Sequence, residues 1–148
     1  NGDIDSPGKA RYVLRATGVD ALMIGRAAQG RPWIFREIAH FLATGEHLPP
    51  PATHDVRRWL TAHLHDHYSL YGEHIGVRSA RKHIGWAVRA LPGGAAFRDE
   101  MNLIADTALQ LRAVDRYFET LADRHERLPL PAAGACAAAN DDSTALAA

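Results

Sequence analysis

Two short glycine turns in the first half of the chain carry residue types that bind phosphate. Asn1-Gly2-Asp3 precedes an expected helix, and Gly25-Arg26-Ala27 follows an expected buried strand. Glycine lets backbone N–H groups approach an anion closely, and the Arg26 guanidinium can add a charged hydrogen bond. Two such turns on successive βα units can hold one phosphate between them. The spacing alone leaves a second interpretation open, which is two ordinary βα loops.

A basic helix face in the second half has the composition of a nucleic-acid contact. At about 100° per residue, the expected helix from Glu73 to Leu91 has an apolar side and an opposite side with these residues: Arg78, Arg81, Lys82, Arg89 and, at its edge, Trp86. From Val56 to Arg98, seven Lys or Arg residues face two carboxylates, a local excess of +5. Clustered arginines beside an aromatic ring suit a phosphate backbone and a stacked base. The pattern favours RNA contact, with a solvated helix face as the alternative.

A pair of histidines has a spacing that metal sites use. His63 and His67 are one helical turn apart, so both imidazoles lie on one face. The glutamate of an HExxH motif is missing, however, and no further ligand is apparent. Both histidines also fall on the apolar stripe of Leu60 and Leu64. We therefore expect a packed, hydrogen-bonded pair and no metal.

Composition excludes several classes of protein. The chain of 148 residues is 47% hydrophobic, which is enough for one core and excludes global disorder. Its 17 Lys and Arg balance 17 Asp and Glu, which excludes a uniformly basic nucleic-acid coat. No apolar run is long enough to span a membrane, and the single cysteine, Cys136, excludes an intrachain disulfide. We expect a cytoplasmic monomer. Because the sequence starts at Asn1 without methionine or a signal-peptide pattern, we expect a piece of something longer.

The elements that position the first turns are predicted to be half of a parallel βαβ unit and a further helix. Ser6 is the expected N-cap of a helix from Pro7 to about Thr17. The apolar run from Val19 to Gly25 has the length of a short buried strand. A second helix is expected from Trp33 to Thr44.

The basic face belongs to a predicted four-helix bundle that follows the proline-rich linker Leu48–Pro51. The composition then shifts to Pro, Ala, Gly, Asn and Asp, which predicts a disordered tail. The expected divisions are residues 1–48, 49–127 and 128–148. The four helices have expected bounds of Thr53–Tyr71, Glu73–Leu91, Ala95–Ala105 and Asp106–Arg124.

Three segments together carry a resemblance to a known family. They read N-G-D-I at residues 1–4, A-L-M-I-G-R-A-A-Q-G-R-P-W-I-F at 21–35 and G-V-R-S-A-R-K-H-I-G-W at 76–86. Over about residues 1–122 the chain resembles the C-terminal part of bacterial tRNA-dihydrouridine synthases, closest to the B type. The resemblance implies a mainly α fold with a small α/β part. It comprises the last βα units of a (β/α)8 FMN barrel, followed by a helical tRNA-binding domain.

The resemblance also implies a chemistry. Such an enzyme takes electrons from NADPH, and reduced FMN delivers hydride to C6 of uracil in tRNA while a cysteine protonates C5. By motif, Asn1, Gly2 and Asp3 match one FMN-binding segment, and Gly25 and Arg26 match the segment that holds the phosphate. The basic face matches the tRNA-docking domain. The catalytic cysteine of the family lies before the N-G-D segment, and Cys136 matches no family motif. We therefore expect this chain alone to be inactive.

Two other functions are also compatible with these sequence features. One is a different FMN barrel enzyme that acts on a small pyrimidine, which would share the phosphate turns but leave the basic helices unexplained. The other is a stand-alone helical RNA-binding module whose first segment is vestigial. A measurement of flavin binding would distinguish this RNA-binding module from both kinds of enzyme.

Overall fold

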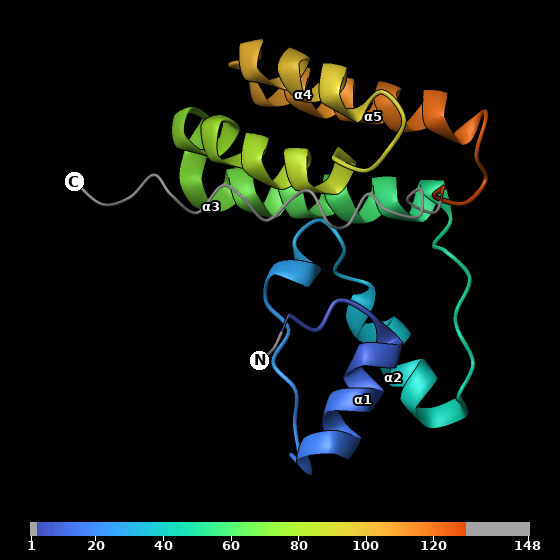
Figure 1. Cartoon of the computed structure of the whole chain (residues 1–148). Coiled ribbons are helices and arrows are strands. Elements are labelled where there is room, and N and C mark those ends of the chain that lie inside the picture. Colours follow the sequence, from blue (N-terminus) through green and yellow to red (C-terminus); the bar gives the residue numbers. More distant parts are fainter. Residues whose placement is uncertain (1–2, 130–148) are drawn as a thin grey trace.

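The computed structural model describes residues 3–129, which form a mainly helical fold without a named β-strand. In Figure 1, α1 and α2 lie on one side of α3, and α4 and α5 lie on the other. None of the helices in this part of the chain combines the length and apolar character that a membrane crossing needs. The elements in order are α1 Pro7–Thr17, the 3-10 turn η1 Arg26–Ala28, α2 Ile34–Thr44, α3 Thr53–Val88, α4 Gly94–Leu103 and α5 Thr107–Ala122.

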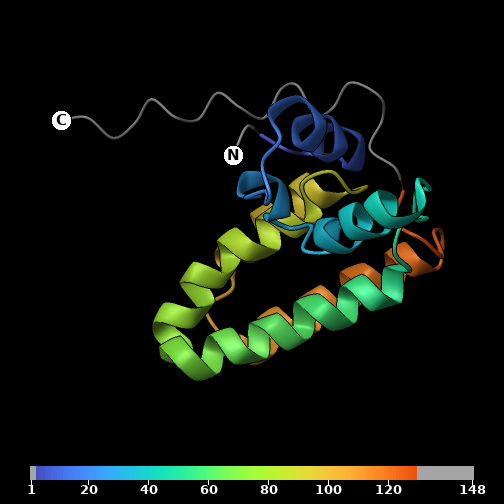
Figure 2. The same cartoon turned by 90° about the horizontal axis from the view of Figure 1, so that it is seen from below.

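The long element α3 consists of two helical arms separated at Gly72. Its backbone there is non-helical (φ 71°, ψ 173°), a region that glycine enters without steric cost. We call residues 53–71 the first arm and residues 73–88 the second arm. Figure 2 shows that the chain reverses direction between them. The two helices expected here are therefore both present, and the second ends at Val88 rather than Leu91.

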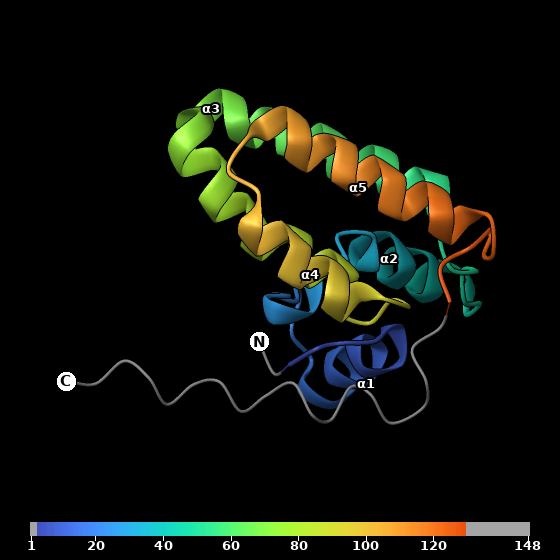
Figure 3. The ribbon, with the colours of Figure 1, turned by 90° about the horizontal axis from the view of Figure 1, so that it is seen from above.

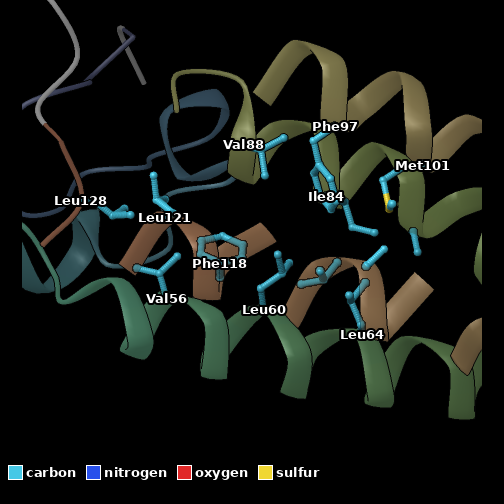
Figure 4. Close-up of a cluster of buried hydrophobic side chains, with 13 residues drawn as sticks. Val56, Leu60, Leu64, Ile84, Val88, Phe97, Met101, Phe118, Leu121 and Leu128 are labelled. Atoms are coloured by element: carbon cyan, nitrogen blue, oxygen red, sulfur yellow. The ribbon is translucent and has the colours of Figure 1, made fainter. Parts of the chain in front are cut away.

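The main core lies between the arms of α3 and the last two helices. Figure 3 shows α5 along the first arm and α4 beside the second. A fully buried glutamine ties the two arms together: Tyr68 donates to Gln110 Oε1 at 2.6 Å, and Gln110 Nε2 donates to the Val77 carbonyl at 3.4 Å. Figure 4 shows most of the apolar side chains that fill this space, including Val56, Leu60, Leu64, Ile84, Val88, Phe97, Met101 and Phe118.

Helix α1 begins and ends where its capping residues predict, and α2 ends at its predicted glycine. The Ser6 hydroxyl accepts from the Lys9 N–H at 3.4 Å, and Pro7 occupies the first helical position of α1. Gly18 and Gly45 end α1 and α2 in the left-handed conformation that glycine favours. Local capping therefore accounts for these three ends, whereas α2 begins at Ile34, one residue later than expected, and has no side-chain cap.

The prediction of a buried strand from Val19 to Gly25 is wrong for this structure. The segment is extended, but Val19 and Met23 are 44% and 62% exposed, whereas Leu22 and Ile24 are only partly buried. A strand needs a neighbour to pair with, and no other strand lies beside this segment within residues 3–129. The small α/β part is consequently not observed.

The proline linker is fastened to the end of the last helix. The Leu128 N–H donates to the Pro51 carbonyl at 3.0 Å, and the Thr53 N–H donates to the Glu126 carbonyl at 2.9 Å. Leu128 is buried in the main core, although the composition assigned it to the disordered tail. That assignment is wrong for Leu128, and residues 130–148, including Cys136, lie outside the described residues.

Candidate functional site

The two predicted phosphate turns are positioned by one small core. Ile4, directly after Asp3, is buried in it, and Ile24, directly before Gly25, packs against the same core. The two turns, 23 residues apart in the sequence, therefore lie side by side. The other members of this core are Ala10, Ile34 and Ile38, with Val13, Leu22, Ala27 and Ala28 packed against them.

An exposed ion pair joins the two turns. Arg26 Nη2 donates to Asp3 Oδ1 at 2.6 Å, and the two side chains are 63% and 62% exposed. Asp3 has a left-handed backbone (φ 50°), which aspartate tolerates better than most residues. An ion pair this exposed stabilises by about 0–1 kcal/mol at most. An incoming anion can therefore compete for the guanidinium at small cost.

The surroundings of Gly25 fit the close approach of an anion. A side-chain carbon built on Gly25 would meet no atom within 4 Å. Its φ of −106° lies outside the region that only glycine favours, so neither packing nor a positive φ requires glycine here. Within residues 3–129, no backbone carbonyl accepts from the N–H groups of Gly25, Arg26 or Ala27. Asn1 and Gly2, the remaining predicted contacts, lie outside the described residues.

The second arm of α3 presents the predicted basic face to solvent. Arg78 and Lys82 on this arm are exposed, and so is Arg89, which directly follows its last residue. Lys82 Nζ lies 4.9 Å from the centroid of the Trp86 ring, a cation–π arrangement. None of the three cations forms a salt bridge within the described part of the chain. The face thus combines unpaired positive charge with a partly exposed aromatic ring.

Arg81 differs from the solvated cation that the helical pattern predicted. It is partly buried, and its Nη2 donates to the Ile104 carbonyl at 2.9 Å. Its Nε atom is buried and lacks a hydrogen-bond partner among residues 3–129. Part of this guanidinium therefore fastens the second arm to the end of α4.

Salt bridges in the folded chain neutralise part of the positive excess that is counted along the sequence. Arg57 pairs with Glu119 at 2.8 Å, and Arg58 pairs with Asp55 at 2.8 Å. Both carboxylates lie outside the segment over which the excess was counted. Arg98, which also belongs to that segment, lies against the second arm: a carbon built on Gly85 would be 3.5 Å from its Cδ. No periodicity within one helix could reveal this neighbour on α4.

The loop that follows η1 contacts the second arm of α3. Gly30, just after η1, has a φ of 74° and lies directly against the Trp86 backbone. A side-chain carbon at Gly30 would be 2.3 Å from both the carbonyl carbon and the carbonyl oxygen of Trp86. This contact joins the segment that carries the second predicted phosphate turn to the helix that carries the basic face.

The histidines are arranged differently from the expected pair. His67 is buried as predicted, but His63 is exposed, and the two rings do not bond to each other. His63 Nε2 lies 3.3 Å from His83 Nδ1, and His67 Nε2 lies 2.7 Å from Ser79 Oγ. Burial, followed by the charge of His63, lowers the pKa of both His67 and His83. The sequence missed His83 because it lies on the other arm.

Comparisons with known proteins identify relatives over most of the chain. The sequence pattern described as "Dihydrouridine synthase (Dus)" matches residues 1–123. The protein named tRNA-dihydrouridine synthase B of Pseudomonas aeruginosa is 57% identical over 118 residues, 80% of this chain and 36% of that protein.

Two further relatives give the same result. The Xanthomonas axonopodis pv. citri protein of this name is 56% identical over 121 residues, 82% of this chain and 36% of that protein. The Klebsiella pneumoniae protein is 53% identical over 122 residues, 82% of this chain and 38% of that protein. The chain thus spans just over a third of the length of the curated relatives it matches.

Proposed function

The chain belongs to the dihydrouridine synthase family, and we propose that it is the C-terminal part of an FMN-dependent tRNA-dihydrouridine synthase. The longer enzyme reduces uridine in tRNA to 5,6-dihydrouridine, with NADPH as the electron source. The observation that carries this proposal is the family match over residues 1–123, together with relatives more than half identical to this chain. We further propose that the enzyme acts in the cytoplasm as a monomer.

The paired turns would hold the phosphate of FMN. Gly25 leaves its surface open, Arg26 offers an exposed guanidinium, and Asp3 sets the position of that guanidinium through the ion pair. Asn1 and Gly2 would complete the first turn. When bound, FMN supplies the two-electron reduction of the uracil ring. The role of the residues in this chain is to bind and orient it by its anionic end.

The second arm of α3 would dock the tRNA. Arg78, Lys82 and Arg89 contribute positive charge toward phosphates, and Trp86 offers a ring against which a base can stack. Arg81 contributes mainly by fixing the second arm to α4. The contact of Gly30 with Trp86 holds the loop after the second phosphate turn against this arm.

The chain also carries a face that suits the rest of a barrel. The extended segment from Val19 to Gly25 has no pairing partner within residues 3–129, and Met23 and Phe35 are 62% and 51% exposed. We propose that the preceding part of the longer protein pairs with this segment and covers these side chains. That part would also supply the acid that protonates the uracil ring. Residues 1–48 would then close the barrel, and residues 49–127 would form the tRNA-binding domain.

A paired assay tests this function. The 148-residue chain and the longer enzyme that contains it are each incubated with FMN, NADPH and unmodified tRNA, and dihydrouridine is measured. We expect product from the longer enzyme and none from the chain alone. Turnover by the chain above a no-protein control would contradict the proposal that the rest of the longer enzyme supplies the acid.

Within the longer enzyme, Gly25→Val tests the phosphate turn. A branched side chain would occupy the surface that the anion approaches, so flavin retained on purification should fall by at least about tenfold. Gly8→Val is the matched control, because Gly8 also has nothing within 4 Å but lies in α1, away from the turn. Full flavin content in a folded Gly25→Val enzyme would show that this turn does not hold the phosphate.

A further inference from the structure

Three histidines from the two arms of α3 converge on one point. His63 and His67 come from the first arm and His83 from the second, and one nitrogen of each lies within 4.8 Å of the others. The three histidines come together because the two arms of α3 pack closely from Gly72 onward. A carbon built on Gly76, for example, would be 3.1 Å from the Tyr68 ring.

The closest pair of nitrogens has the separation of two ligands on one metal ion. His63 Nε2 and His83 Nδ1 are 3.3 Å apart. Zinc binds imidazole nitrogen at about 2.0–2.1 Å in tetrahedral geometry, which places neighbouring ligand atoms about 3.3–3.4 Å apart. This pair, hydrogen-bonded in the metal-free chain, already has the spacing of two ligands on one ion, and His67 needs a shift of about 1 Å or more.

A hydrogen-bond chain fixes the protonation of the third ring. The Ser79 hydroxyl donates to the Ile75 carbonyl at 2.8 Å, so it accepts from the Nε2–H of His67 at 2.7 Å. His67 Nδ1 then carries the lone pair. Ring N–H groups held in this way are a regular feature of metal-bound histidines, because they set the tautomer and raise the basicity of the ligand.

We propose that His63, His67 and His83 form a binding site for Zn²⁺ that clamps the two arms of α3 together. Imidazole suits zinc and related divalent transition ions, and the exposed position of His63 leaves room for water as a fourth ligand. The packed pair that the sequence favoured lacked a third ligand, and His83 supplies it. The lowered pKa values of His67 and His83 keep both rings neutral near neutral pH, as ligation requires. Lys82 opposes a bound cation, but its ammonium lies over the Trp86 ring.

Calorimetric titration of the metal-free chain with Zn²⁺ alone tests the site, using protein without an added histidine tag. We expect one ion per chain and a rise in the melting temperature, since an ion that binds only the folded state stabilises it. Co²⁺ in place of Zn²⁺ should give the intense visible absorption of a tetrahedral site. Absence of saturable binding would overturn the proposal.

Variants separate this cluster from adventitious histidine binding. His63→Ala and His83→Ala should each weaken Zn²⁺ binding by at least about tenfold and abolish the thermal shift. His63 is exposed, so its replacement leaves the fold intact, which circular dichroism verifies. His65→Ala and His74→Ala are matched controls, because both are exposed histidines of α3 outside the cluster. Wild-type affinity in both cluster variants, or an equal loss in the controls, would refute the site.

Discussion

Gly30 meets two separate constraints at one residue. Its φ of 74° favours glycine, and its α-carbon faces the Trp86 carbonyl so closely that a methyl group would overlap it at 2.3 Å. Backbone atoms cannot rotate out of the way as a side chain can. This residue therefore holds the loop after η1 against the second arm of α3.

Gly30→Ala should consequently destabilise the chain more than a glycine replacement that meets only the first constraint. Gly18 supplies that comparison, because its φ is 67° but nothing lies within 4 Å of the added carbon. We expect Gly18→Ala to cost about 1 kcal/mol and Gly30→Ala about 2–4 kcal/mol of unfolding free energy. Urea denaturation of both variants measures the difference, and equal losses would show that the packing of Gly30 against Trp86 contributes nothing.

Residue roles that depend on near neighbours in the sequence are predictable, and the others are not. Ser6 caps a helix through a contact three residues away, so its role follows from local sequence. The two turns were expected to share one phosphate, but the ion pair of Asp3 with Arg26 across 23 residues was not predicted. His83 was missed because its partners lie on the far side of Gly72, where helical spacing carries no information.

At the scale of an element, the two arms of α3 should respond to acid together. The titratable groups gathered there are His63, His67, His83, Lys82 and Tyr71. Burial first and then the charges of neighbouring groups lower the pKa of His67 and His83 below the ordinary 6.5. Unfolded histidines therefore bind protons more readily than folded ones as the pH falls. Their contribution to stability is present above about pH 6.5 and is lost as the pH falls through their folded pKa values.

Denaturation of the metal-free chain at about pH 7.5 and about pH 5, with a chelator present, measures this response. We expect a smaller unfolding free energy at the lower pH and a shallower decrease in His83→Gln. His65→Gln should behave like the wild type, because its ring is exposed. A decrease in His83→Gln as steep as in the wild type would show that the cluster does not couple to folding.

Helices were predicted well because their signals are local, whereas the strand was not. The bounds of α1 follow from Ser6, Pro7 and Gly18, and the break between the arms follows from Gly72. The segment from Val19 to Gly25 has strand composition, but a strand forms only beside another strand. Within residues 3–129 none is available, so the segment stays extended and unpaired. The double role of Arg81 was equally hidden, because it depends on where α4 ends.

At the scale of the whole molecule, the two cores meet where the proposed functions meet. Trp33, just before α2, packs against Trp59 on the first arm, with ring centroids 6.0 Å apart, while Gly30 contacts Trp86 on the second arm. The small core positions the phosphate turns, and the large core positions the basic face. The small core and the two arms of α3 are therefore in direct contact. The central claim of the proposed function is that the second arm docks the tRNA.

Titration of labelled unmodified tRNA with the 148-residue chain, at several salt concentrations, tests this claim most directly. The double variant Arg78→Ala, Lys82→Ala should bind more weakly, and its salt slope should be shallower by roughly one log unit for each phosphate that is no longer neutralised. Arg112→Ala with Arg124→Ala is the control, because it removes the same charge from exposed positions on and just after α5. We predict that this control retains wild-type affinity and slope, and that near-ultraviolet circular dichroism shows all variants folded. If the Arg78 and Lys82 variant bound tRNA with wild-type affinity and slope, the second arm would be only a solvated face, and its role in tRNA docking would be contradicted.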